Sequence, residues 1–448
     1  MRELPAYRTG RHPIPLKTFN FNWMKKLFIF VFFLLFVSSY ESSAQTFRAG
    51  AALRKITPGK LIPISGGMGT PELPTGFQGD LFARALVLEK GETRVAIVSI
   101  DNLGWPSVLG DRSRALIKEI PAENILIGVT HTHSAPDAYA FPDESGKVSA
   151  DLEYLDWCVK QIADAVNEAF SNLEPAVLKS AVGEAKGKIA YNYYAPQLYD
   201  PRCGVMQFIA SEGKSKGKTI ATLVNYATHP EILGTKRRLI SPDLCGPLYE
   251  RIESKAGGMA IFMNSAQGGM VTADNRRENN TEANDWDECI RIGHLMADEA
   301  LRIIEPAPVQ NNPELFCASK IVEFPIESEM MQQAIKYSPI LSQASVKDDF
   351  SSFTTRMNLL NIGKAQVFTI PGEALPNIGF YLKRKMNTRQ PFLFGLTNDA
   401  IGYIMTKTDF DSFERYRYIS RTSLGEMTGE ILIEEALKMV EENPGSEK

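Results

Sequence analysis

The stretch ILIGVTHTH, residues 125–133, is a short apolar run that ends directly in two histidines. Apolar runs of this length between turn signals are typical of buried strands, and polar residues begin here where the strand should end. In open α/β sheets, ligands bind at the carboxyl ends of strands. The stretch therefore predicts an α/β fold with a functional site beside the end of this strand.

The same arrangement recurs along the chain. The apolar run at 219–227 leads to His229, and the run at 364–370 leads to Glu373. Further strands are predicted at 84–88, 94–100, 259–263 and 392–396, and helices at 150–170, 282–304, 373–385 and 424–440. With no internal repeat or low-complexity linker, we expect residues 45–448 to form one α/β domain with a mixed sheet.

Composition and charge narrow the class of protein. The chain has 448 residues, of which 44% are hydrophobic and 23% are charged, which is typical of a globular protein with a sizeable core. A net charge of −4 does not indicate a nucleic-acid partner or an anionic membrane. Five widely spaced cysteines without a CxxC pair favour free thiols over a disulfide framework.

The amino terminus has the pattern of a secretory signal peptide. Met24-Lys25-Lys26 precedes an apolar run from 27 to 37, and small residues end at Ala44. We predict a leader over residues 1–44, translation from Met24 and export to the periplasm or the medium. The run is shorter than the roughly 20 apolar residues of a membrane span, so we expect no stable span after cleavage. An uncleaved signal anchor is the alternative.

Histidine is scarce in this sequence. His131 and His133 are separated by one residue, so on an extended segment both rings face the same side. Neutral imidazole is the commonest metal ligand, and a catalytic zinc takes three or four protein ligands. Taken singly, each histidine is more simply structural, and His294 in a predicted helix is assigned that role; His12 lies in the predicted leader.

Several motifs, in their order and spacing, resemble the neutral (non-lysosomal) ceramidases. They are SID at 99–101, THTHSAP at 130–136, NYATHP at 225–230, PGE at 371–373 and the stretch from Asn398 to Ile404. The resemblance covers nearly the whole mature chain. It implies a mixed-sheet catalytic domain like the amino-terminal domain of that family. We expect no counterpart of the family's carboxyl-terminal immunoglobulin-like domain, as in the shorter bacterial ceramidase-like proteins that the chain resembles.

The resemblance also implies a zinc site. Position by position, the ligands are His131, His229, Glu373 and Tyr403, while His133 stays off the metal and faces the substrate. Two imidazoles, a carboxylate and a phenol would hold a zinc-bound water that attacks an amide carbonyl. His133 would polarise or protonate the oxyanion or the leaving group.

Two aspartates are candidate supporting residues. Asp101 is expected to orient a zinc-binding histidine through its free ring nitrogen. Asp243 is a candidate for water activation or for support of the ligands. The alternative for both is a helix-cap or turn residue, equally weighted for Asp101 and favoured for Asp243.

One segment departs from the family pattern. The ceramidases carry a serine in a Gly-Asp/Asn-x-Ser-Pro segment, and Val271 aligns with that serine, with Thr272 on the opposite side of an extended chain. Ceramide itself is therefore in doubt as the substrate. Gly268-Gly269 either brings backbone N–H groups to the substrate or forms a simple turn.

Three functions follow from these observations. The first is zinc-dependent hydrolysis of an amide in an N-acyl lipid or acylated amino sugar, with another metal as an alternative to zinc. The second is ester or glycan cleavage on the same scaffold. The third is a non-catalytic binding protein, against which the complete ligand set argues. Residues 329–353 are a candidate lid, and an acyl groove or the core could take up Phe141, Met330, Met331 and Ile340.

Overall fold

The structure is a computed structural model that describes residues 10, 46–143, 145–278 and 281–446. The chain divides into two compact units, Met1–Gln45 and Thr46–Lys448. The predicted leader, residues 1–44, lies outside the described residues except for Gly10. The second unit carries all the elements given below.

The larger sheet contains nine strands and is mixed. β5 pairs in parallel with β6, and β11 with β13, while the other pairs are antiparallel. Along the sheet the order is β13 (Met259–Asn264), β11 (Thr219–Tyr226), β10 (Arg202–Ala210), β8 (Glu174–Glu184), β1 (Arg48–Lys55), β4 (Phe82–Lys90), β5 (Thr93–Ile100) and β6 (Ile125–Val129), with β15 (Val309–Gln310) beside β8. The predicted mixed sheet is confirmed.

A second mixed sheet, which the sequence analysis did not separate from the first, has four strands. They are β16 (Leu315–Pro325), β17 (Ser352–Ile362), β18 (Ala365–Thr369) and β20 (Gln390–Phe394), with β18 and β20 parallel. Four two-stranded pairs complete the β-structure: β2 (Ile64–Ser65) with β7 (Ala135–Pro136), β3 (Gly76–Phe77) with β12 (Leu239–Ile240), β9 (Ala190–Asn192) with β14 (Val271–Ala273), and β19 (Glu373–Ala374) with β21 (Tyr403–Ile404).

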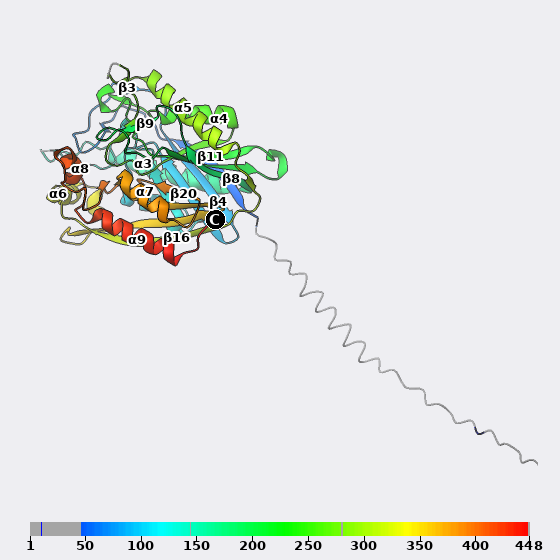
Figure 1. Cartoon of the computed structure of the whole chain (residues 1–448). Coiled ribbons are helices and arrows are strands. Elements are labelled where there is room, and N and C mark those ends of the chain that lie inside the picture. Colours follow the sequence, from blue (N-terminus) through cyan, green and yellow to red (C-terminus); the bar gives the residue numbers. More distant parts are fainter. Residues whose placement is uncertain (1–9, 11–45, 144, 279–280, 447–448) are drawn as a thin grey trace, which may run out of the picture. The chain divides into compact units, whose positions relative to one another are not determined.

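The two sheets pack on each other, and helices cover their outer faces (Figure 1). Leu223 of the large sheet and Leu360 of the second sheet belong to one buried cluster between them. The outer face of the large sheet packs against α3 (Leu152–Ser171), α4 (Cys245–Ala256) and α5 (Trp286–Ile304). The outer face of the second sheet packs against α6 (Glu329–Tyr337), α7 (Pro376–Lys385) and α9 (Thr428–Glu442).

The remaining helices are short. They are α2 (Ser107–Arg114), α8 (Arg417–Arg421) and the single 3₁₀ turns Ala122–Asn124, Gly213–Ser215, Thr235–Arg237, Leu341–Gln343 and Glu414–Tyr416. Among the described helices, none has both the length and the apolar character that crossing a membrane requires. All five cysteines are free thiols, as predicted, and four are buried.

The large sheet curves so that its edge strand β13 passes close to β5. The hydroxyl of Ser99 on β5 donates a hydrogen bond to the carbonyl oxygen of Phe262 on β13 at 2.5 Å. A close approach also forms at β6, where a Cβ on Gly128 would lie 2.6 Å from the Met263 methyl group. This curvature brings the ends of β6, β11 and β13 together, and the candidate site lies there.

Candidate metal centre

His131 and His229 follow β6 and β11, and one buried side chain ties their two loops together. Asn264, at the end of β13, donates from Nδ2 to the carbonyl oxygens of Thr130 at 3.0 Å and Thr228 at 2.7 Å. These are the residues directly before the two histidines. Its Oδ1 accepts from the backbone N–H of Thr228 at 3.3 Å. Asn264 therefore sets the separation of the two imidazoles.

The backbone at His131 differs from the expected extended segment. His131 has a φ of 70°, in the left-handed region that side chains seldom adopt. Its N–H donates to the carbonyl oxygen of Asn102 at 2.9 Å, which holds this conformation. The rings of His131 and His133 still converge, but through this local bend rather than through strand alternation. Such unusual backbone is concentrated at functional sites.

Glu373 and Tyr403 are placed side by side by the short parallel pair β19 and β21. The two residues are direct partners in its register, and the N–H of Glu373 donates to the carbonyl oxygen of Gly402 at 2.9 Å. Gly402 has a φ of 87°, and a Cβ there would collide with the carbonyl oxygen of Thr422. Only glycine fits that position, so the backbone before Tyr403 is closely constrained.

The two histidines present their Nε2 atoms to the Glu373 carboxylate. Oε2 of Glu373 lies 3.1 Å from Nε2 of His229 and 3.5 Å from Nε2 of His131. The Nδ1 atoms contact backbone carbonyl oxygens, that of Leu103 at 2.5 Å for His131 and that of Val271 at 2.7 Å for His229. A carbonyl can only accept, so each Nδ1 carries the proton and each Nε2 is left with its lone pair.

These three ligand atoms fit a cation. The two Nε2 atoms and the carboxylate oxygen each offer a lone pair, and lone pairs this close together require a proton or a positive ion between them. In the protein alone, burial opposes a protonated His229, but Glu373 raises its pKa to about 9. Burial also opposes the ionised Glu373, yet His131 and His229 hold the pKa of this carboxyl below its ordinary value. Nitrogen and oxygen donors in this arrangement suit zinc.

His133 and Tyr403 border this group. Nε2 of His133 lies 3.4 Å from Nε2 of His131, and its Nδ1 lies 3.4 Å from Oε2 of Glu231. Ring nitrogens of His131, His133 and His229 lie within 4.8 Å of one another, so three histidines form a second set that could hold a metal. Burial, and then the charge of Glu373, raise the pKa of the Tyr403 hydroxyl well above its ordinary value.

The two candidate aspartates contact other groups. Asp101 accepts from the N–H of Phe82 at 2.9 Å and from the Tyr249 hydroxyl at 3.4 Å. Asp243 accepts from the N–H of Leu233 at 2.8 Å, ahead of α4. Backbone carbonyls occupy both Nδ1 positions where Asp101 was expected. In the described structure neither aspartate contacts a candidate ligand: Asp101 links β4 to α4, and Asp243 holds the backbone at Leu233 without forming a side-chain cap on α4.

The segment aligned with the family's serine supports the site through its backbone. The side chain of Val271 is fully buried in the core beside α4 and α5, while its carbonyl oxygen contacts His229. The preceding residue, Met270, lines the cavity described below, and its sulfur lies 3.9 Å from the Tyr403 hydroxyl. A Cβ on Gly268 would collide with the Glu373 carbonyl oxygen, so this glycine permits close backbone packing.

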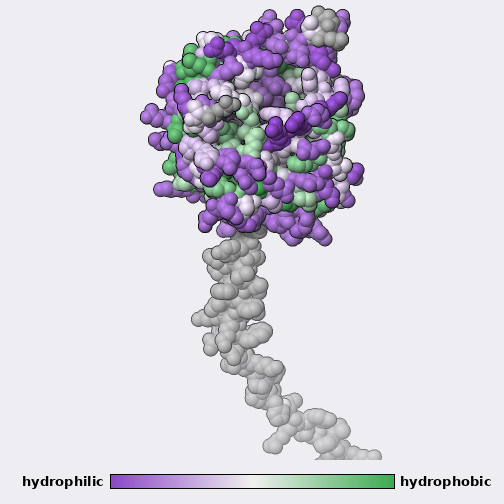
Figure 2. Space-filling view, turned by 90° about the vertical axis from the view of Figure 1, so that its left-hand side faces the viewer, coloured by the Kyte–Doolittle hydropathy of each residue, from purple (hydrophilic) through white to green (hydrophobic). Residues whose placement is uncertain are grey.

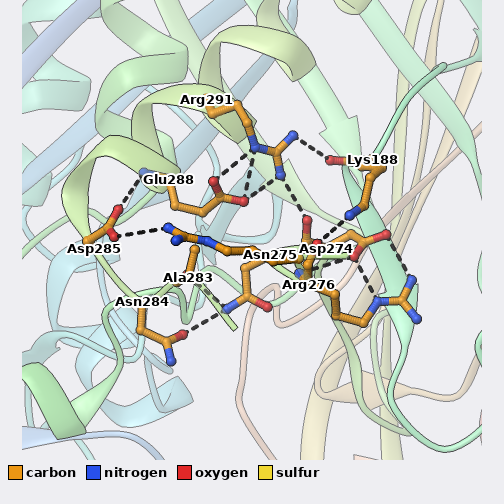
Figure 3. A network of polar contacts seen from close by, with 10 residues as sticks. Lys188, Asp274, Asn275, Arg276, Ala283, Asn284, Asp285, Glu288 and Arg291 are labelled. Atoms are coloured by element: carbon orange, nitrogen blue, oxygen red, sulfur yellow. Dashed lines mark hydrogen bonds and ion pairs between the residues drawn. The ribbon is translucent and has the colours of Figure 1, made fainter. Parts of the chain in front are cut away.

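A polar network formed around Asp274, Asn275 and Arg276, directly after β14, holds the end of this strand in place (Figure 3). Asp274 pairs with Arg276 at 2.8 Å, and its carbonyl oxygen accepts from Arg291 of α5 at 2.9 Å. Asn275 donates to the carbonyl oxygen of Ala283 at 3.1 Å. The charges pair with each other, so we assign the network an anchoring role for the strand that contacts His229.

The histidines open onto a cavity of about 270 Å³. Its wall is largely apolar, and it includes Met68, Phe141, Met331, Ile335, Leu341, Phe353 and Leu424. Of the four residues for which the sequence left a groove or the core open, Phe141 and Met331 line the cavity, Met330 is exposed and Ile340 is buried in the core. Figure 2 views the side on which α6 and α8 lie in Figure 1, and hydrophobic residues gather in the middle of that largely hydrophilic face.

We predict that Asn264→Ala weakens metal binding by about 10- to 100-fold, as loss of groups that orient ligands does. It also leaves two buried carbonyls without a donor, which costs about 2–5 kcal/mol of folding stability. Zinc competition with a chelator and thermal unfolding measure the two effects. Asn172→Ala, which removes an exposed hydrogen bond to Ala51, is the control. Unchanged zinc affinity in Asn264→Ala would contradict this role.

The comparisons with known proteins agree with this fold. No family model and no curated protein matches the sequence. The structure is similar to that of neutral ceramidase from Pseudomonas aeruginosa, with a TM-score of 0.71 and 18% identity over 90% of this chain and 76% of that chain. A structure of ceramidase complexed with C2 matches with the same TM-score and identity, over 90% and 77%. The chain therefore has a neutral ceramidase-like fold, as the resemblance of its motifs predicted.

Proposed function

We propose that this protein is an exported zinc-dependent hydrolase that cleaves an amide bond in an N-acyl compound. The observation that carries the proposal is the convergence of His131, His229 and Glu373, at 3.1–3.5 Å, on one wall of an apolar cavity. The neutral ceramidase-like fold supports the same class of reaction. We propose Tyr403 as the fourth ligand, because its hydroxyl lies beside this carboxylate.

Each of these residues has a definite part in the reaction. His131, His229, Glu373 and Tyr403 would hold the zinc, which would supply Lewis-acid chemistry by acidifying water and polarising a carbonyl group. The backbone carbonyls of Leu103 and Val271 keep the two ligand imidazoles in the tautomer that offers Nε2. His133 directs Nδ1 toward Glu231, so its Nε2 is free to take a proton from water and deliver it to the leaving amine.

The cavity suits an acyl chain. Side chains from α6 and from the segment that follows it, Met331, Ile335, Leu341 and Phe353, form an apolar wall beside the histidines. Burial of such a chain contributes about 0.8 kcal/mol per methylene group. The apolar wall favours N-acyl substrates over glycans, whose hydroxyls would lack partners there.

Metal content and hydrolysis test the proposal together. Purified protein spanning residues 45–448 is expected to carry about one zinc per chain and to release amine from a fluorogenic N-octanoyl amide. A chelator should abolish this activity, because the proposed hydrolysis depends on the bound metal, and added zinc should restore it. Protein that remains metal-free when zinc is offered would contradict the proposal. Amino-terminal sequencing of exported protein tests cleavage after Ala44.

A further inference from the structure

The cavity wall carries three carboxylates but no lysine or arginine among its described lining residues. The carboxylates are those of Glu231, Glu373 and Asp399. Glu373 belongs to the candidate metal centre. Asp399 is fully buried, and its Oδ1 accepts from the N–H groups of Ser107 at 3.0 Å and Ala400 at 2.9 Å. Glu231 is therefore the carboxylate best placed to meet a substrate.

Glu231 is held close to the reacting groups. It follows His229 by two residues, and its Oε2 lies 3.4 Å from Nδ1 of His133. Its side chain is 28% exposed, and in the described part of the chain no ion pair joins it to a lysine or arginine. A carboxylate that lacks a cationic partner in a partly buried site is stabilised by hydrogen-bond donors that a ligand brings.

Part of the apolar wall lies next to Tyr403. A Cβ on Gly402, next to Tyr403, would lie 3.9 Å from the terminal methyl group of Met331 on α6. With an amide bond at the metal centre and its acyl chain along α6, we assign the amine portion to the polar part of the cavity that His133 and Glu231 line. This orientation rests on the proposed function.

We propose that Glu231 selects the amine portion of the substrate. The subsite accepts a hydroxyl or ammonium group and rejects N-acyl compounds whose amine portion ends in a carboxylate or phosphate. A charge-assisted hydrogen bond to Glu231 favours the donors, and repulsion from the same carboxylate, with which no described lysine or arginine pairs, disfavours the anions at this subsite. The wrong ligand leaves this partly buried carboxylate without a hydrogen-bond donor, which increases the discrimination.

Three matched ligands test this selection by binding alone. They are the N-octanoyl derivatives of 3-aminopropanol, 1,3-diaminopropane and β-alanine, which differ in the charge of one terminal group. Calorimetry with the zinc-loaded protein is expected to give affinities for the alcohol and the ammonium compound at least tenfold above that of the carboxylate. In Glu231→Gln this tenfold difference in affinity should fall to less than about threefold. Glu414→Gln, whose side chain is 85% exposed, is the control that should leave the gap unchanged.

The possible outcomes separate this inference from the proposed function. Equal affinities in the parent protein, failure of all three ligands to bind, or an unchanged gap in Glu231→Gln would each overturn the selection. A role for Glu231 only in orienting His133 would lower hydrolysis of all substrates equally and leave the binding gap intact. Graded binding without hydrolysis would overturn the proposed function and leave the selection standing.

Discussion

Glu373→Gln is expected to empty the candidate metal centre while the fold persists. Zinc content should fall from about one per chain to below about 0.1, with hydrolysis lost in parallel. The reason is that the carboxylate supplies the negative charge between Nε2 of His131 and Nε2 of His229. Glutamine has the same shape, and its amide N–H can donate to a ring nitrogen, so no buried acceptor is left alone.

Elemental analysis and thermal unfolding of the metal-free proteins measure this prediction. The metal-free variant should unfold at a temperature within a few degrees of that of the metal-free parent. Glu231→Gln is the matched control, because it removes a neighbouring carboxylate that we do not assign as a ligand, and it should retain zinc. A Glu373→Gln protein that binds zinc as tightly as the parent would show that the metal is held by other residues.

The strands that carry the site were predictable because their sequences are locally unambiguous. β6 spans Ile125–Val129 as predicted, and β11 and β13 agree to within one residue at either end. Each is buried on both faces and reads as a continuous apolar run. The helices α3 and α7 also agree closely, since Asp151 caps the first and Pro376 opens the second.

The long antiparallel strand β16 was not predicted, and the reason lies in its exposure. Few of its residues are buried, and the charged Lys320 and Glu323, on opposite faces of the strand, interrupt its apolar pattern. Such a segment gains its strand conformation from its partner β17 rather than from its own composition. The separation into two sheets depends on that pairing, which the sequence does not reveal. A single sheet was therefore predicted.

Within the site, the candidate ligand side chains could be predicted from the sequence, but the backbone contacts that orient them could not. Histidine and glutamate at strand ends are visible in a sequence. The carbonyl oxygens of Leu103 and Val271 fix both ring tautomers, but every residue has a carbonyl group, so no sequence signal marks them. Asn264 could have been noticed as a polar residue at the end of an apolar strand, although its two carbonyl partners required the folded chain.

His133→Gln should separate chemistry from metal binding. We expect zinc content to remain near one per chain and kcat to fall by about 10²- to 10⁴-fold, the range for loss of a general acid–base group. KM should change little, because the apolar wall that binds the acyl chain is untouched. The expectation follows from the position of His133 beside the proposed ligands: among the described residues, the Glu373 carboxylate contacts Nε2 of His131 and of His229 but not His133.

The same variant decides between the two ligand sets that the geometry offers. If the metal is bound by His131, His133 and His229, His133→Gln loses zinc together with activity, and Tyr403→Phe retains both. If His131, His229, Glu373 and Tyr403 are the ligands, Tyr403→Phe weakens zinc binding and His133→Gln does not. His294→Gln, on α5, is the control for removal of an imidazole and should change neither quantity. Zinc content and kcat measured on these three variants therefore assign His133 either to the metal or to the proton.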